Sequence, residues 1–159
     1  MLFIVCKILK PLVIKVKGHW YYLYRAVDKT GQTIDFLLTE QRDEAAALRL
    51  LKKAIRRHGI PEKITIGGSA ANEAAIKSYN EECGTAIEIR KRKYLNNIVE
   101  QDHRGVKRIT RPMLGFKAFD AAQSTLTGIE LMHMLRKGQL AGGREAGCSA
   151  AEQFYALAA

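Results

Sequence analysis

Hydrophobic and polar positions alternate along much of the first forty residues of this chain, and the spacing of the hydrophobic positions then becomes helical. Short runs rich in β-branched and aromatic residues predict strands, and tight connections between the first three indicate an antiparallel meander. The predicted strands are 13–16, 20–27, 33–38, 63–66 and 86–89.

Apolar residues three and four positions apart predict helices between and after these strands. Asp43 begins the first helix, which Gly59 and Pro61 end, and Ser149 with Glu152 has the spacing of a capping box. The predicted helices are 43–57, 70–80, one that contains Glu100, 118–136 and a last turn or two from 149.

The order of three strands, helix, strand, helix, strand and helix is that of the RNase H-like fold. We therefore expect an α/β protein with a central mixed five-stranded sheet, in which three antiparallel strands precede parallel ones, flanked by helices. A chain of 159 residues that is 47% hydrophobic can bury one core. We assign 13–138 to this core, 1–12 to a separate N-terminal segment, and 139–159 to a linker with a short C-terminal helix.

The chain carries a formal net charge of +10, and much of this excess lies between residues 85 and 112. This segment contains eight lysines and arginines but only three acidic residues. Such a basic field attracts polyanions, foremost nucleic acid, although a solubilising surface would have the same composition. Three widely spaced cysteines form no metal-binding pattern, and Lys7 interrupts the apolar start. We therefore expect a cytoplasmic protein without a membrane segment.

Asn96, Asn97, Glu100, Arg104 and Lys107 fall at helical spacing and share one face of the predicted helix. A single carboxylate followed along one face by cations suits a site where a metal ion and a phosphate backbone meet. The alternative is structural, because Asn97 and Glu100 also have the spacing of a helix cap and its capping-box partner.

The cations around this helix are candidates for contacts with DNA phosphates. They are Arg90, Lys91, Arg92, Lys93, Arg104, Lys107 and Arg108. Trp20 and Tyr24 lie in a predicted strand, so we expect them to pack on the sheet rather than to stack on bases.

Five segments of the chain carry a resemblance to a known family: KVKGHW at 15–20, LYRAVD at 23–28, TIDFLL at 33–38, KYLNNIVEQDH at 93–103 and RPMLGFK at 111–117. On these segments the chain resembles the insertion-sequence-six family of bacterial DDE transposases. The resemblance implies an integrase-like catalytic core that cleaves and joins DNA, with Mg²⁺ or Mn²⁺ as cofactor and transposon ends as DNA partner. It also implies association with the nucleoid, and homo-oligomers or mixed oligomers with an intact transposase.

The two aspartates and one glutamate that hold metal ions in this family are only partly present here. By position, the first aspartate falls at Lys10 and the second at Gly67. The glutamate is Glu100, and the family's basic residue seven positions later is Lys107. The chain thus resembles a truncated and degenerate transposase, which we expect to be catalytically inactive or nearly so, with Glu100 as its remaining metal ligand. The alternative is a non-catalytic DNA-binding or regulatory module that assembles with an intact transposase.

Other acidic residues are poorly placed to replace the lost aspartates. Asp28 follows the second strand, and Asp35 lies within the third at a position that does not face the glutamate in this fold. Asp102 lies about 200° around the helix from Glu100 and should point away from it.

Overall fold

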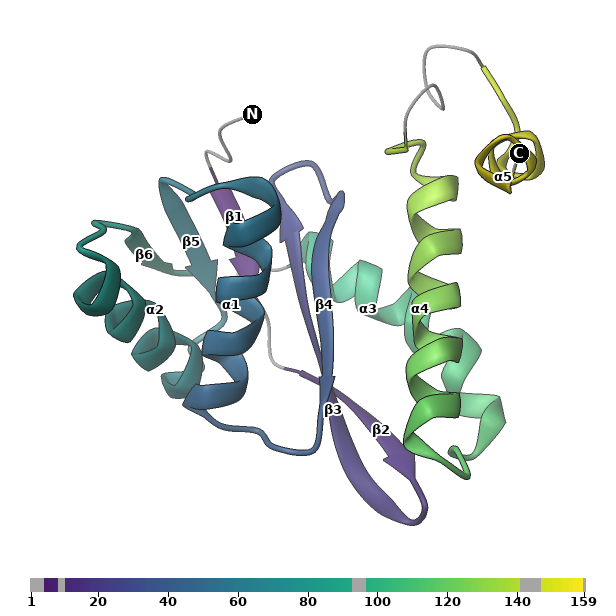
Figure 1. Ribbon diagram of the computed structural model, residues 1–159, viewed down its shortest axis with the longest axis horizontal. Coiled ribbons are helices and arrows are strands. Elements are labelled where there is room, and N and C mark those ends of the chain that lie inside the picture. Colours follow the sequence, from purple (N-terminus) through teal and green to yellow (C-terminus); the bar gives the residue numbers. More distant parts are fainter. Residues whose placement is uncertain (1–4, 9–10, 93–96, 141–146, 159) are drawn as a thin grey trace.

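The computed structural model describes residues 5–8, 11–92, 97–140 and 147–158, which form an α/β fold (Figure 1). The strands are β1 (Val5–Ile8), β2 (Leu12–Val16), β3 (His19–Asp28), β4 (Thr33–Thr39), β5 (Lys63–Ile66) and β6 (Glu88–Lys91). The helices are α1 (Glu44–His58), α2 (Ala70–Cys83), α3 (Asn97–Thr110), α4 (Phe119–Arg136) and α5 (Ala150–Ala158), with a 3₁₀ turn, η2 (Arg111–Met113), after α3.

The sheet has six strands rather than the five that the sequence pattern predicts. The additional strand, β1, pairs antiparallel with β3, where Cys6 is opposite Asp28, and parallel with β5, where Cys6 is opposite Ile64. The sequence pattern does not indicate a strand there, because Lys7 interrupts the apolar run at the start of the chain. Part of the segment 1–12, which we placed outside the core, therefore belongs to the middle of the sheet.

The long strand β3 organises the antiparallel half of the sheet. Its residue Leu23 is paired with Leu12 of β2 on one side and with Leu38 of β4 on the other. Because Ala26 is similarly paired with both β1 and β4, β2 and β1 follow one another along the same edge of β3. Beyond β1, the strands β5 and β6 continue the sheet in parallel, as predicted.

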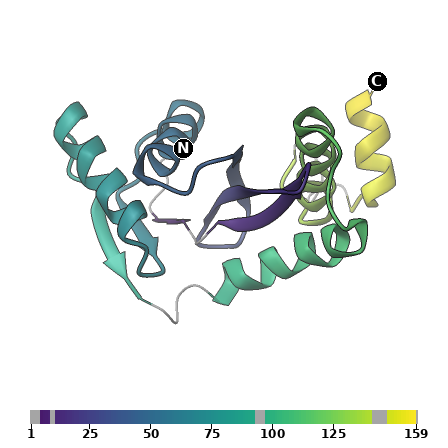
Figure 2. The ribbon, with the colours of Figure 1, turned by 90° about the horizontal axis from the view of Figure 1, so that it is seen from below.

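Two hydrophobic cores lie on opposite faces of this sheet (Figures 1 and 2). Consecutive residues of β3 point to opposite faces of the sheet, so Tyr24 is buried in one core and Leu23 in the other. Helices α1 and α2 cover the first face, with Leu50 and Ile76 in the core. Helices α3 and α4 cover the second face, and the core there includes Val106 of α3.

The ends of two helices agree with their predicted signals. The carboxylate of Asp43 accepts a hydrogen bond from the Ala46 backbone N–H at 2.9 Å, which caps α1. At the start of α5, the Ser149 backbone N–H donates to Glu152 at 2.6 Å, and the Glu152 N–H donates back to the Ser149 hydroxyl at 3.3 Å. This is the predicted capping box.

One other prediction needs correction, because the strand expected at 86–89 lies two residues later, as β6. On α4, Ala122 and Leu126 are buried, whereas Phe119 and Met132 are each 39% exposed. None of the helices within the described ranges has the length and apolar character needed to cross a bilayer.

Candidate nucleic-acid interface around Glu100

A cavity of about 800 Å³ lies beside β2, on the edge of the sheet. Its walls come from β2, from Trp20 of β3, from Gly67 after β5, from one face of α3, and from η2 with the loop that follows it. Glu100 and Gly67 both line this cavity, so the fold brings together two of the three positions that the family resemblance assigns to acidic ligands. Lys10, the third of these positions, lies outside the described residues.

The loop after η2 is held against β2 by backbone hydrogen bonds. Phe116 donates its N–H to the Lys15 carbonyl, and its own carbonyl accepts from the Lys17 N–H, both at 2.8 Å. Gly115 precedes this pair with a φ of +120°, and a Cβ there would lie 3.2 Å from the Lys15 carbonyl oxygen. The glycine therefore allows the loop to approach β2 closely enough to form one wall of the cavity.

Positive charge dominates the lining of the cavity. Lys15 of β2, Arg104 and Lys107 of α3, and Arg111 of η2 surround it, and the carboxylate of Glu100 is the single acidic group among the lining residues. All four cations are exposed, and none forms an ion pair with a described residue. The cavity consequently presents a net positive field to solvent.

This composition does not fit a two-metal centre. Gly67 supplies no side-chain oxygen, and the described part of the chain contains no cluster of three His, Cys, Asp or Glu residues able to hold a metal ion. A divalent cation at Glu100 would also lie in a cavity lined by four positive side chains. A pair of hard cations needs several acidic oxygens, which these residues do not provide.

The remaining predicted DNA-binding residues lie outside this cavity. Arg108 is exposed on α3 and is not part of the lining. Arg90 and Lys91 belong to β6, at the end of the sheet path opposite β2, and they pair with Glu88 at 3.3 Å and Glu73 at 2.6 Å. Arg92 is exposed directly after that strand, and Lys93 lies outside the described residues.

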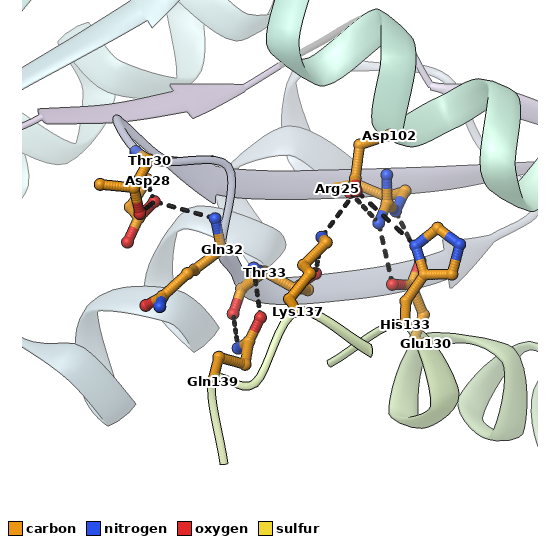
Figure 3. Close-up of polar contacts among 10 residues, drawn as sticks. All are labelled: Arg25, Asp28, Thr30, Gln32, Thr33, Asp102, Glu130, His133, Lys137 and Gln139. Carbon is orange, nitrogen blue, oxygen red and sulfur yellow. Dashed lines mark hydrogen bonds and ion pairs between the residues drawn. The ribbon is translucent and has the colours of Figure 1, made fainter. Parts of the chain in front are cut away.

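Behind the cavity, a buried ionic network attaches α3 to the sheet and to α4 (Figure 3). The fully buried guanidinium of Arg25 donates to Glu130 of α4 at 2.5 and 2.9 Å and to Asp102 of α3 at 2.5 Å. Asp102 also lies 2.6 Å from the Lys137 ammonium and 3.6 Å from Nδ1 of His133. Asp102 thus points away from the Glu100 face of the helix, as its position in the sequence predicts.

The network determines the charge state of Asp102. Burial by itself would raise the pKa of this carboxyl, but the contact with His133 and the charges of Arg25 and Lys137 outweigh it and hold the pKa far below its usual range. Sequence reasoning did not identify this cluster. The available signal was Arg25 itself, a charged residue within the apolar run of β3, where a partner is required.

The two other aspartates considered as replacements have different partners. Asp35 is buried beside α1, with Lys53 at 3.1 Å and Arg57 at 3.6 Å. Asp28 accepts hydrogen bonds from the backbone of Thr30 at 2.8 Å and from Gln32 at 2.9 Å, which closes the turn between β3 and β4. Neither lines the cavity of Glu100.

Trp20 lies on the surface of the sheet rather than in its core. It lies opposite Lys15 in the β2–β3 hairpin, lines the cavity, and is 58% exposed. The Lys15 ammonium lies 5.7 Å from the centre of its ring. Tyr24, four residues later, is buried as expected, because the strand has by then entered the core.

Comparison with known proteins places the fold and this site in context. The DDE domain family matches residues 9–139 of the chain. The transposase for the insertion sequence-like element IS431mec of Staphylococcus aureus is 38% identical over 131 residues, which cover 78% of this chain and 54% of that protein. The transposase of insertion sequence element IS257 in transposon Tn4003 of Staphylococcus aureus has the same identity and coverage. The chain spans about half the length of these relatives.

Solved structures with a similar fold are integrase and transposase catalytic domains. The HTLV-2 integrase catalytic core domain in complex with magnesium has a TM-score of 0.63 at 14% identity, over 96% of each chain. The catalytic domain of Mos1 mariner transposase has a TM-score of 0.55 at 12% identity, over 79% of this chain and 69% of that one. These likenesses confirm the predicted α/β fold of the RNase H-like class.

Proposed function

Because the chain belongs to the DDE domain family of transposases, we propose that it is a transposase-derived DNA-binding domain that has lost metal-dependent strand transfer. The observation that carries the proposal is the cavity shared by Gly67 and Glu100, in which one carboxylate remains among four cations. In the family pattern the remaining ligand position is an aspartate, whereas this sequence has the positively charged Lys10 there.

The loss of activity follows from the charges that phosphoryl transfer requires. In such reactions two divalent ions, roughly 3.5–4 Å apart, activate the attacking oxygen and stabilise the leaving one. Glu100 alone cannot hold such a pair, and the four cations of the cavity would repel both ions. The same cations attract the phosphates of DNA without a metal ion. The chain therefore keeps the ability to bind DNA although it has lost the ability to catalyse strand transfer.

We expect this binding to be weak and independent of sequence. Basic side chains that contact phosphates without reading bases give dissociation constants on the order of 10⁻⁴–10⁻⁶ M at physiological salt. Arg104, Lys107 and Arg111 follow one another along α3 and η2 at the cavity, and we assign them the main contacts. Transposon ends are therefore bound no more tightly than other DNA.

The test is Mn²⁺-dependent nicking and joining of labelled transposon-end DNA by the chain and by its Glu100→Gln variant. We expect no product from either protein. Activity in the chain that disappears in the variant would mean that other groups hold the metal ions, and it would overturn the proposal.

A restoration experiment addresses the replaced positions directly. Gly67 is not among the glycines with positive φ, so the backbone accepts an aspartate there. We expect the Lys10→Asp/Gly67→Asp double variant to bind Mn²⁺ measurably by calorimetry, whereas Gly67→Asp alone does not. Equal Mn²⁺ binding by the unchanged chain would contradict the assignment of these positions.

A second candidate function is a non-catalytic subunit that assembles with an intact transposase. It is favoured by α5, whose Phe154, Tyr155 and Leu157 are 44%, 72% and 56% exposed. Co-purification of a tagged full-length transposase with this chain, but not with a chain lacking α5, would support this role. Purification of each protein alone would exclude it.

A further inference from the structure

The cavity beside Glu100 has an aromatic side as well as a basic one. Trp20 and Lys15 are opposite each other in the β2–β3 hairpin, and both side chains are exposed at the cavity. Val13, on the same face of β2 as Lys15, is 49% exposed, and Leu114 on the facing loop is 88% exposed. Large apolar side chains exposed in the lining of one cavity indicate a surface that a ligand covers.

The shape and charge of the cavity restrict that ligand. A volume of about 800 Å³ lies within the range of small-ligand sites and has room for one or two nucleotides. The four cations attract a polyanion, and the exposed indole offers a surface on which a planar group can stack. Stacking needs a free base face, which DNA offers only where its bases are unpaired.

We propose that this cavity binds an unpaired segment of DNA without a divalent metal, with a base stacked on Trp20 and phosphates held by Lys15, Lys107 and Arg111. The proposal rests on the proposed function for its choice of DNA as partner. It goes further by naming the form of the DNA and the residue that recognises it. Glu100, once part of a metal site in the family, opposes this binding because its carboxylate faces the phosphates.

The sequence provides a direct probe, because Trp20 is the only tryptophan of the chain. Titration with an oligothymidylate of about ten nucleotides in EDTA should quench its fluorescence to saturation. A blunt duplex should bind the basic surface with little quenching. If the duplex binds but the oligothymidylate leaves the Trp20 fluorescence unchanged, this inference is overturned and the proposed function stays intact. Failure to bind either DNA would overturn both.

Variants measured by anisotropy of a labelled oligothymidylate separate stacking from charge. Trp20→Ala, at an exposed position, should weaken binding about 5- to 100-fold. Lys107→Gln should weaken binding of the oligothymidylate and should lower the slope of log K against log salt concentration by about 0.7. Lys29→Gln, the control in the β3–β4 turn, should change the affinity and the slope by less. An affinity that Trp20→Ala leaves unchanged would overturn the inference.

The Glu100→Gln variant distinguishes metal-free from metal-dependent binding. If phosphates bind directly to the cations, removal of the carboxylate should tighten binding about 2- to 5-fold in EDTA. If a divalent ion mediates binding, the unchanged chain should bind the oligothymidylate only with Mg²⁺ or Mn²⁺, and the variant should bind it more weakly. The second pattern would overturn the proposal.

Discussion

Arg25 on β3 and Glu130 on α4 form a two-point ion pair in the interior, with Nε–Oε1 and Nη2–Oε2 distances of 2.5 and 2.9 Å and both side chains fully buried. The charged guanidinium is favoured by these contacts even though burial opposes it, and the pKa of Arg25 is raised above its usual value. The pair attaches α4 to the centre of the sheet, and removal of either charge should be costly.

We predict that Glu130→Gln lowers the free energy of unfolding by about 3 kcal/mol, because it leaves a buried guanidinium only partly compensated. Glu82→Gln is the matched control, since Glu82 pairs with Lys52 at 2.7 Å but both side chains are about half exposed. Urea unfolding should show a clear shift in midpoint for the first variant and none for the second. Equal midpoints would mean that the buried pair contributes no more than the exposed one.

The stability of the protein should fall in acid partly because of Asp102. Its pKa is lowered in the folded protein, so its stabilising effect is complete above the unfolded pKa of about 3.9 and is lost as the pH falls below it. Asp102→Asn should be less stable at pH 7 and should lose less additional stability between pH 5 and pH 3. Parallel stability–pH curves for the two proteins would contradict this role.

Gly105 and Gly128 form a matched pair of helical glycines. An added Cβ at Gly105 would lie 2.4 Å from Cε1 of His133, whereas at Gly128 of α4 it would meet nothing within 4 Å. Gly128→Ala should therefore stabilise the protein by about 0.5–1 kcal/mol through helix propensity. Gly105→Ala should instead destabilise it by about 1 kcal/mol, because His133 must move away from Asp102.

A double variant tests the cause of that difference. In a His133→Ala background the clash is absent, so Gly105→Ala should become stabilising. Thermal unfolding of the four proteins gives the coupling energy between the two positions. A coupling energy near zero would show that the histidine is not the obstacle.

The two ends of the chain should differ in their importance for folding. Deletion of residues 1–8 removes β1, which is paired with strands on both sides, and should abolish cooperative unfolding. Deletion of 147–159 removes α5, which has no buried residue, and should leave the unfolding transition in place. Circular dichroism during urea unfolding checks both, and a cooperative transition in the first protein would contradict the central role of β1.

Most of the fold follows from patterns in the sequence, because amphipathic helices and alternating strands have periods that reflect burial. β1 was missed because Lys7 interrupts its apolar run, and its place in the sheet depends on long-range pairing with β3 and β5. The exposure of Trp20 could not be predicted either. Whether a residue near the end of a strand is covered depends on which helix extends over it, and α1 and α2 do not cover this one.

The site was predictable in one respect and not in another. The helical spacing of Glu100, Arg104 and Lys107 correctly placed these residues together, since helix geometry alone determines it. Their meeting with Gly67 was predicted only through the family resemblance. Arg25, Asp102 and Glu130 are far apart in sequence, and no local pattern indicates that they share one ionic network.

The ionic network also constrains how the protein is made. During synthesis Arg25 leaves the ribosome long before its acidic partners Asp102 and Glu130, which lie 77 and 105 residues later. Until α4 emerges, burial of β3 would enclose a guanidinium without its counter-charges. The nascent chain must therefore keep the middle of its sheet open to water, and the domain can complete its fold only after nearly all of it has been translated.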